Sequence, residues 1–181
     1  MIILLGAPGS GKGTQTDKLS RKLQISTVCM GDIVRNHITL GTNLGTKMKS
    51  FLDRGDLVPD EIINEMFAEN KPDLKKPFGA ILDGFPRTID QAKFLASLYS
   101  DSNINIKVIS LEVNDDILIQ RLLDRNRSDD SIDVIKNRLI TYKREIDPLL
   151  TYYQENLSIV NGDSSVDDVF NRIYSVLKNN T

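Results

Sequence analysis

Glycines recur close together near the start of the chain, immediately before a lysine. Residues 6–12 read GAPGSGK and fit the first seven positions of the pattern G-x-x-x-x-G-K-[ST]. Such glycines let the backbone curl until successive N–H groups point at phosphate oxygens, and Lys12 adds a full positive charge. A glycine-rich turn that binds nothing is the alternative. We favour a phosphate-binding loop, because Lys12 is present and the segment lies between a predicted strand and a predicted helix.

The residue after this lysine departs from the pattern. Gly13 stands where most such loops carry a Ser or Thr hydroxyl that binds Mg²⁺, and Thr14 follows one residue later. Asp83 ends an apolar run at the carboxyl edge of a predicted strand, where α/β sheets collect their ligands. Alone, Asp83 before Gly84 would be read as a turn or capping aspartate. With the phosphate-binding loop in the same chain, we expect Asp83 to face Mg²⁺ through water.

Short apolar runs alternate with helical patterns along the chain. Their near-continuous apolarity is typical of parallel strands that are covered on both faces. The alternation predicts an α/β, doubly wound fold. The predicted strands are residues 2–5, 27–29, 80–82, 108–113 and 157–160, and the longest helical pattern runs from 132 to 150.

Length, composition and charge are those of a globular protein. The chain has 181 residues, 40% of them hydrophobic and 27% charged, which predicts one domain over residues 1–181. The net charge of −2 argues against nucleic acid as a partner, because sequence-independent binding needs a surplus of Lys and Arg.

The first residues and the only cysteine bear on compartment and metals. Residues 1–5 are too few to span a bilayer or to form the core of a signal peptide, so we expect no membrane association. Cys29 can form no internal disulfide and cannot hold zinc by itself. A reducing compartment and a cytoplasmic location are therefore expected.

Four motifs occur together in one order along the chain. They are GSGKGT at 9–14, GDIVR at 31–35, DLVPDE at 56–61 and DGFPR at 83–87. In type, order and approximate spacing these motifs resemble the adenylate kinase family, and the similarity covers nearly the whole chain. The resemblance implies a P-loop NTPase-type fold with a five-stranded parallel sheet and helices on both faces. It also implies a flap at residues 30–59 that closes over a nucleoside monophosphate and a very short lid at residues 124–130 that closes over ATP.

The same resemblance implies the reaction and its ligands. The reaction would be reversible, Mg²⁺-dependent transfer of the terminal phosphoryl group of ATP to AMP, giving two ADP. ATP would contact Gly9, Ser10, Gly11, Lys12, Gly13, Thr14, Arg121 and Arg125, with Ser164 a candidate for the adenine. AMP would contact Met30, Arg35, Asp56, Leu57, Val58, Gly84, Phe85, Pro86, Arg87, Gln91, Arg127 and Arg138. The catalytic set would be Lys12, Asp83, Arg87, Arg121, Arg125, Arg127 and Arg138.

Arginines rather than an acid–base pair carry this predicted chemistry. The acceptor phosphate is already a competent nucleophile, so phosphoryl transfer needs mainly positioning and positive charge, which guanidinium groups supply bidentately. Longer-lid relatives insert a subdomain, sometimes with zinc-binding cysteines, where only Asn126 separates Arg125 from Arg127 here. We therefore expect a minimal lid and no zinc.

The sequence leaves more than one base possible for the acceptor nucleotide. The amide of Gln91 complements adenine but could also pair with cytosine, or with uracil after an amide flip. Met30 matches neither the threonine usual in adenylate kinases nor the alanine usual in pyrimidine monophosphate kinases, and it could equally be a packing residue of the flap. Ser164 could likewise belong to a plain strand-to-helix turn.

Two other functions are alternatives to AMP phosphorylation. A UMP/CMP kinase is the nearest alternative, and a non-catalytic, nucleotide-responsive binding module is the second. A binding module has no need of Arg35, Arg87, Gln91 and Arg138 together, so we favour an enzyme. Its expected partners are ATP and AMP, and a monomer is expected from the family resemblance.

Overall fold

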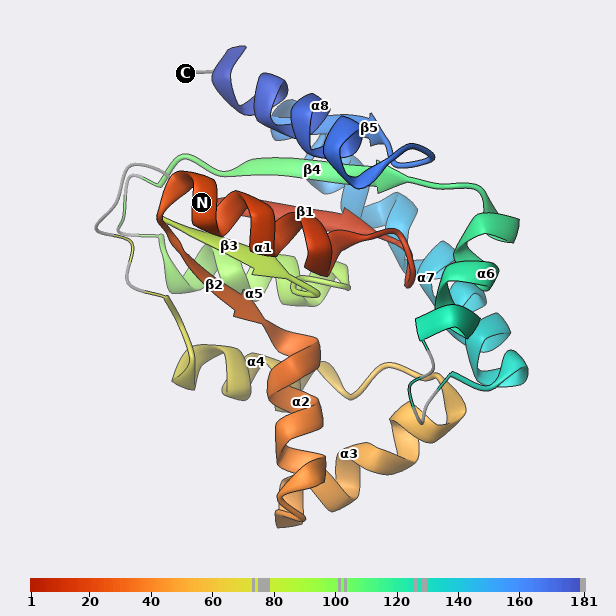
Figure 1. The fold of residues 1–181 in the computed structure, drawn as a ribbon. Helices are drawn as coiled ribbons and strands as arrows, with labels where there is room; N and C mark the ends of the chain where they lie inside the picture. Colours follow the sequence, from red (N-terminus) through yellow and green to blue (C-terminus); the bar gives the residue numbers. More distant parts are fainter. Residues whose placement is uncertain are drawn as a thin grey trace.

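A parallel five-stranded sheet forms the centre of the molecule (Figure 1). The computed structural model describes residues 1–72, 74, 79–100, 102, 104–125, 127 and 130–179. The strands are β1 (Ile2–Gly6), β2 (Ser26–Cys29), β3 (Ala80–Asp83), β4 (Lys107–Glu112) and β5 (Leu157–Asn161), in the order β2-β3-β1-β4-β5. Every neighbouring pair is parallel. The α/β fold and the five strands predicted from the sequence are confirmed.

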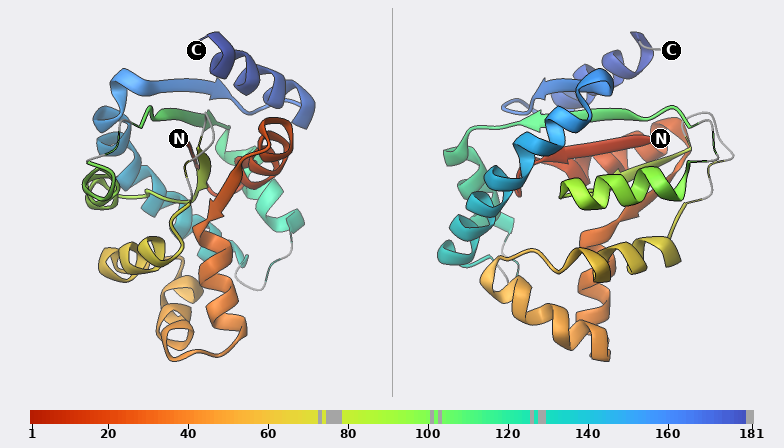
Figure 2. Two further views of the ribbon diagram at one scale, coloured as in Figure 1. Left: turned by 90° about the vertical axis from the view of Figure 1, so that its left-hand side faces the viewer. Right: turned by 180° about the vertical axis from the view of Figure 1, so that it is seen from behind.

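Helices cover both faces of this sheet. Figures 1 and 2 show α1 (Lys12–Leu23) and α8 (Val166–Asn179) on one face, and α5 (Ile89–Leu98) and α7 (Ile132–Tyr152) on the other. Because side chains alternate along a strand, Ile2 and Leu4 pack into the cluster with α1 and α8. Ile3 and Leu5 pack into the cluster with α5 and α7. The three central strands, β1, β3 and β4, are thus buried on both faces, whereas the edge strands β2 and β5 keep exposed residues.

The remaining helices lie outside these two pairs. They are α2 (Met30–Thr39), α3 (Asn43–Arg54), α4 (Asp60–Glu69) and α6 (Asp115–Arg125), and a 3-10 turn, η1 (Gln154–Asn156), precedes β5. Among these helices, α4 packs against α5. In the described residues, no helix combines the length and the apolarity that crossing a membrane requires.

The predicted flap, residues 30–59, contains α2 and α3 as a pair of packed helices beyond the edge of the sheet (Figure 1). A Cβ atom at Gly45 would lie only 2.1 Å from the carbonyl oxygen of His37, so α3 passes α2 almost backbone to backbone. At the other end of α3, the side chain of Asn137 in α7 donates to the Arg54 carbonyl at 2.6 Å and to Asp56 at 3.0 Å. The flap therefore touches α7 on the far side of the site.

Candidate active site

One large cavity lies at the carboxyl ends of the strands, between the glycine-rich loop, the flap and the end of α6. Its volume is about 770 Å³. Every site residue predicted from the sequence lines it except Phe85. Residues that are distant in the chain therefore share one space, which is large enough for more than one small ligand.

The glycine-rich loop forms one wall of this cavity, between β1 and α1. Gly9 and Gly11 have φ angles of 85° and 93°, a region that L side chains rarely adopt, and the Ser10 N–H donates to the Ala7 carbonyl at 3.0 Å. The Lys12 ammonium donates to the carbonyl oxygens of Gly6 and Ala7 at 2.6 and 3.0 Å. The loop thus wraps around its own lysine at the N-terminus of a helix, an arrangement suited to anions.

The electrostatic surroundings of Lys12 make its charge sensitive to pH. Burial lowers the pKa of Lys12 from 10.5 to about 8, and the Asp83 carboxylate opposes this effect. Arg87 and Arg138 lower the pKa further by repulsion. A cluster of cations around one carboxylate is a place where a polyanion would be strongly stabilised.

Asp83 is the carboxylate of the site. It ends β3, is 6% exposed and lies near Gly13, where a Cβ atom would be 3.7 Å from Oδ2 of Asp83. Carboxylate oxygens are ligands that Mg²⁺ prefers. In the part of the chain that the structure describes, no group of three or more His, Cys, Asp or Glu side chains could hold a metal. A divalent cation beside Asp83 would thus take most of its ligands from phosphates and water, which fits Mg²⁺ carried by a nucleotide.

Cys29 lies beside Asp83, a position that was not predicted from the sequence. Its thiol donates weakly to Oδ2 of Asp83 at 3.9 Å. Burial, followed by the nearby carboxylates of Asp83 and Asp32, raises the pKa of the Cys29 thiol to about 12. The thiol is therefore kept protonated and is a poor nucleophile.

The predicted acceptor side of the cavity is built around the turn that follows β3. Arg87 donates from Nε to the Gly84 carbonyl at 2.9 Å, and a Cβ atom at Gly84 would lie 3.0 Å from Nη2 of Arg87. Glycine at this position leaves the room that the guanidinium occupies. Burial lowers the pKa of Arg87, with Asp83 opposing, although the side chain keeps contact with solvent. Across the cavity, Arg35 of α2 pairs with Asp32.

Asp130 binds arginines of the predicted short lid and of α7. Its side chain is 1% exposed and accepts from Arg125 at 2.7 and 2.8 Å and from Arg138 at 3.1 Å. The backbone N–H of Arg127 donates to the same carboxylate at 3.3 Å. Burial alone would raise the pKa of Asp130, but the hydrogen bonds and charge of Arg125, with Arg127 and Arg138, hold it below its usual value.

Asp130 therefore joins the end of α6 to α7. Three residues of the predicted lid, 126, 128 and 129, lie outside the described residues. The remaining arginine, Arg121 of α6, donates to the Gly162 carbonyl at 3.1 Å. Ser164, the candidate for the ATP adenine, lies two residues after Gly162 and lines the cavity nearby.

Comparison with known proteins bears directly on this arrangement. A family model described as adenylate kinase matches residues 4–158. The adenylate kinase of Mycobacteroides abscessus is 44% identical over 177 residues, which cover 97% of this chain and 98% of that protein. Those of Mycolicibacterium smegmatis and Mycobacterium tuberculosis are 43% and 42% identical over 179 residues, with the same coverage. The chain belongs to the adenylate kinase family.

Membership of the adenylate kinase family confirms the resemblance drawn from the four motifs. It also makes the chain an enzyme of the nucleoside monophosphate kinase class. The UMP/CMP alternative is not favoured, because the matching relatives are adenylate kinases. The roles of individual residues remain predictions, and the structure adds where each side chain lies.

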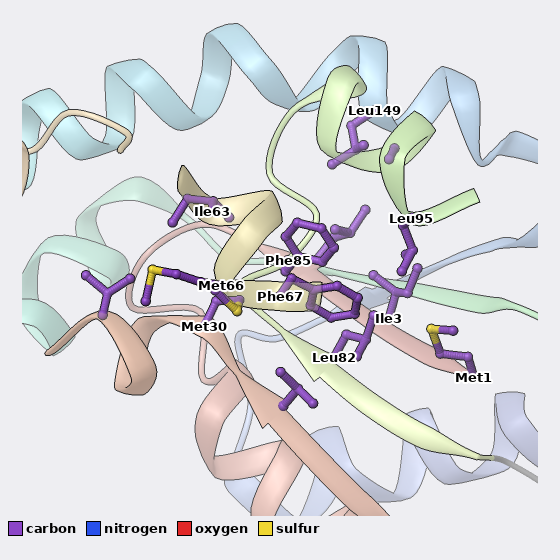
Figure 3. Packing of buried hydrophobic residues seen from close by; sticks show 14 of the residues in the cluster. Met1, Ile3, Met30, Ile63, Met66, Phe67, Leu82, Phe85, Leu95 and Leu149 are labelled. Carbon is purple, nitrogen blue, oxygen red and sulfur yellow. The ribbon is translucent and has the colours of Figure 1, made fainter. Parts of the chain in front are cut away.

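Three residues predicted to contact AMP, which are Met30, Val58 and Phe85, belong to the hydrophobic core of this adenylate kinase family member. Figure 3 shows Met30 beside Met66, and Phe85 beside Phe67. The rings of Phe85 and Phe67 stack with centroids 4.2 Å apart. Met30 is 2% exposed and lines the cavity as well, so it serves both packing and the cavity wall. Phe85 does not line the cavity, so its side chain serves packing.

The predicted base-reading residue, Gln91, is held by the protein at both ends of its amide. Its Nε2 donates to Oδ1 of Asp60 at 2.7 Å, and its Oε1 accepts from the backbone N–H of Arg87 at 2.7 Å. The contact with Asp60 was not predicted from the sequence. Asp60 lies in the DLVPDE motif, which is typical of the family. Its partner Gln91 is on another helix, so no local sequence pattern predicts the contact.

Proposed function

We propose that this chain catalyses the reversible, Mg²⁺-dependent transfer of the terminal phosphoryl group of ATP to AMP, giving two ADP. The observation that carries the proposal is the single cavity in which the phosphate-binding loop and Lys12 face arginines from the flap, the β3 turn and α7. Membership of the adenylate kinase family supports AMP as the acceptor. A binding module is disfavoured because it would need a donor site alone.

The roles proposed for the side chains follow from their positions. The loop at Gly9–Thr14 and Lys12 bind the phosphates of ATP, with Arg121 and Arg125 on the lid side. Arg35 and Arg87 hold the phosphate of AMP, whose oxygen is the attacking nucleophile. Arg127 and Arg138 lie between the two nucleotides, where guanidinium groups stabilise the charge on the transferring phosphoryl group.

Asp83 is the residue proposed to hold Mg²⁺ through water. When bound, Mg²⁺ supplies neutralising charge across the phosphate oxygens of ATP. The carboxylate also attracts both Lys12 and Arg87, which offsets the repulsion between these two cations. No residue of the chain needs to act as a general base, because the acceptor phosphate is already ionised at neutral pH.

Two segments are proposed to close over the nucleotides. Residues 30–59 would cover AMP and residues 124–130 would cover ATP, and closure would exclude the water that could otherwise hydrolyse ATP. We also propose that the protein acts as a monomer in the cytoplasm. The monomer rests on family resemblance, and the compartment rests on the single cysteine.

A coupled assay tests the proposed function directly. The protein is given MgATP with AMP, CMP, UMP or GMP in separate reactions, and formation of the nucleoside diphosphate is measured. We expect AMP to give the highest kcat/KM and chelation of Mg²⁺ to abolish turnover. A preference for a pyrimidine acceptor, or ATP binding without phosphoryl transfer to any acceptor, would overturn the proposal.

A further inference from the structure

We propose that Asp60 is a positioning residue that fixes the orientation of the Gln91 amide and so makes the acceptor site reject bases with the reverse hydrogen-bonding pattern. The inference rests on the proposed function, since it concerns how AMP is selected. Asp60 is the first residue of α4, and Gln91 is the third residue of α5. The two helices pack against each other, which brings residues 31 positions apart into contact.

Both ends of the Gln91 amide have partners of fixed polarity. Nε2 donates to Oδ1 of Asp60 at 2.7 Å, and an ionised carboxylate can only accept. Oε1 accepts from the N–H of Arg87 at 2.7 Å, and a backbone N–H can only donate. A flipped amide would place oxygen against oxygen at Asp60 and N–H against N–H at Arg87.

The Asp60 carboxylate is itself held in place. Its second oxygen accepts from the hydroxyl of Thr88 at 2.6 Å, and Thr88 caps α5 by accepting from the backbone N–H of Gln91 at 3.2 Å. The carboxylate, the cap and the amide therefore form one closed network. Gln91 is 1% exposed, so water cannot replace hydrogen bonds that a flip would break.

The network leaves a defined edge of the amide for a ligand. A primary amide has two N–H groups and an oxygen that can accept twice, and the two contacts use one of each. Gln91 lines the cavity, whose wall also includes Met30, Val58 and Ile63. The remaining N–H and the remaining oxygen lone pair match adenine, whose N1 accepts and whose N6 amine donates.

The fixed orientation separates bases by pattern. Hypoxanthine and uracil present a ring N–H beside a carbonyl oxygen, which is the reverse of adenine and would need the flipped amide. Cytosine presents the same pattern as adenine and differs in ring size. The sharpest probe is therefore IMP, which has the size of AMP and the reverse pattern.

The test measures kcat/KM for AMP and for IMP at saturating MgATP in the wild type and in Asp60→Ala. We expect the wild type to prefer AMP strongly and Asp60→Ala to lower the AMP:IMP ratio by about tenfold, as loss of a buried hydrogen-bonded partner implies. The change should fall on KM for the monophosphate and leave KM for ATP unaltered. Because both substrates are measured on one preparation, the ratio does not depend on the folded fraction.

Three further variants separate positioning from general damage. Glu61→Ala removes the neighbouring carboxylate of the first turn of α4 and should leave the ratio unchanged. Asp60→Asn keeps an oxygen that can accept from Gln91 and an amide that can donate to Thr88, so it should restore most of the ratio. Thr88→Val removes the hydroxyl that holds Asp60 and should lower the ratio in the same direction as Asp60→Ala.

Each outcome decides one of the two proposals. A wild type that does not phosphorylate AMP overturns the proposed function. A wild type that prefers AMP, combined with an unchanged ratio in Asp60→Ala and Thr88→Val, overturns the role of Asp60 alone. A wild type that uses IMP as well as AMP, or a Glu61→Ala ratio that falls as far as that of Asp60→Ala, also overturns it.

Discussion

Most of the cationic side chains of the site are held by the protein itself. Lys12 donates to carbonyls of its own loop, Arg87 to the Gly84 carbonyl, and Arg125 to the buried carboxylate of Asp130. Side chains that are already ordered lose little conformational freedom when they bind a phosphate. At the scale of the residue, the site is thus a set of prearranged charges rather than a source of nucleophiles or bases.

Arg87→Ala should remove most of the turnover with AMP without unfolding the protein. The loss in kcat/KM should be about 10²-fold or more, because Arg87 is proposed to hold the attacking phosphate of AMP, and misplacing a reacting group by about 1 Å can cost about 10²-fold in rate. The thermal midpoint should stay near that of the wild type. Arg21→Ala, on the exposed side of α1, is the matched control and should retain full activity. Comparable rates in the two variants would contradict the assignment.

The lowered pKa of Lys12 predicts a fall in activity at mildly alkaline pH. The protonated ammonium is the form that attracts phosphates, and burial lowers its pKa from 10.5 to about 8, so the charge is lost near pH 8. We expect kcat/KM for MgATP, which reports the free enzyme, to decline above that pH. Bound phosphates should keep Lys12 protonated, so kcat at saturating ATP should decline only at higher pH. Two superimposable profiles would argue against Lys12 as the group that titrates.

At the scale of the element, close helix contacts shape the flap. The α2–α3 pair has Gly45 at its closest approach, and α7 receives the end of α3 through Asn137. The proposed lid is shorter than the proposed flap. In it, the carboxylate of Asp130 forms ion pairs with Arg125 of α6 and Arg138 of α7. The predicted flap also contributes Met30, Val34, Met48 and Val58 to the hydrophobic core, whereas Asp130 joins Arg125 to Arg138.

Gly45→Ala should destabilise the flap. The new methyl group would lie 2.1 Å from the His37 carbonyl oxygen, so the helices must separate. Overpacking of this kind costs about 1–3 kcal/mol, which should lower the thermal midpoint by roughly 2–12 °C and raise KM for AMP. Ser50→Ala, on the exposed side of α3, is the control and should change neither quantity appreciably. An unaltered midpoint in Gly45→Ala would show that the two helices are not packed as described.

At the scale of the whole molecule, both nucleotides are proposed to share one cavity. A ligand made of two adenosines joined by a phosphate chain should therefore stabilise the fold more than ATP or AMP alone at equal concentration. At about 100 times its Kd, the gain is about 2.7 kcal/mol, or roughly 5–10 °C in the midpoint for a chain of this size. The shift should shrink in Lys12→Ala. A shift no larger than that from AMP would indicate separate sites.

Local patterns in the sequence were enough for the elements and for the phosphate loop. Strands buried on both faces need continuous apolar runs, and a phosphate cradle needs glycines directly before a lysine, so both can be read within a few residues. Arg35 and Arg87 of the proposed acceptor side were predicted from the motifs GDIVR and DGFPR, which occur in the same chain in the order typical of the family. Their gathering in one cavity follows from the parallel sheet, because strand ends meet at one edge.

Only the tertiary structure shows which polar atoms of these residues already have hydrogen-bond partners within the protein. From the sequence, the Gln91 amide could face a base in either direction, because a lone amide has no preferred side. The structure places Asp60 and the Arg87 N–H against its two ends, and their opposite polarities allow one orientation. Phe85 likewise belongs to a family motif, yet its ring stacks on Phe67 away from the cavity. Such contacts join residues from different elements, and only the packing of those elements determines which partners meet.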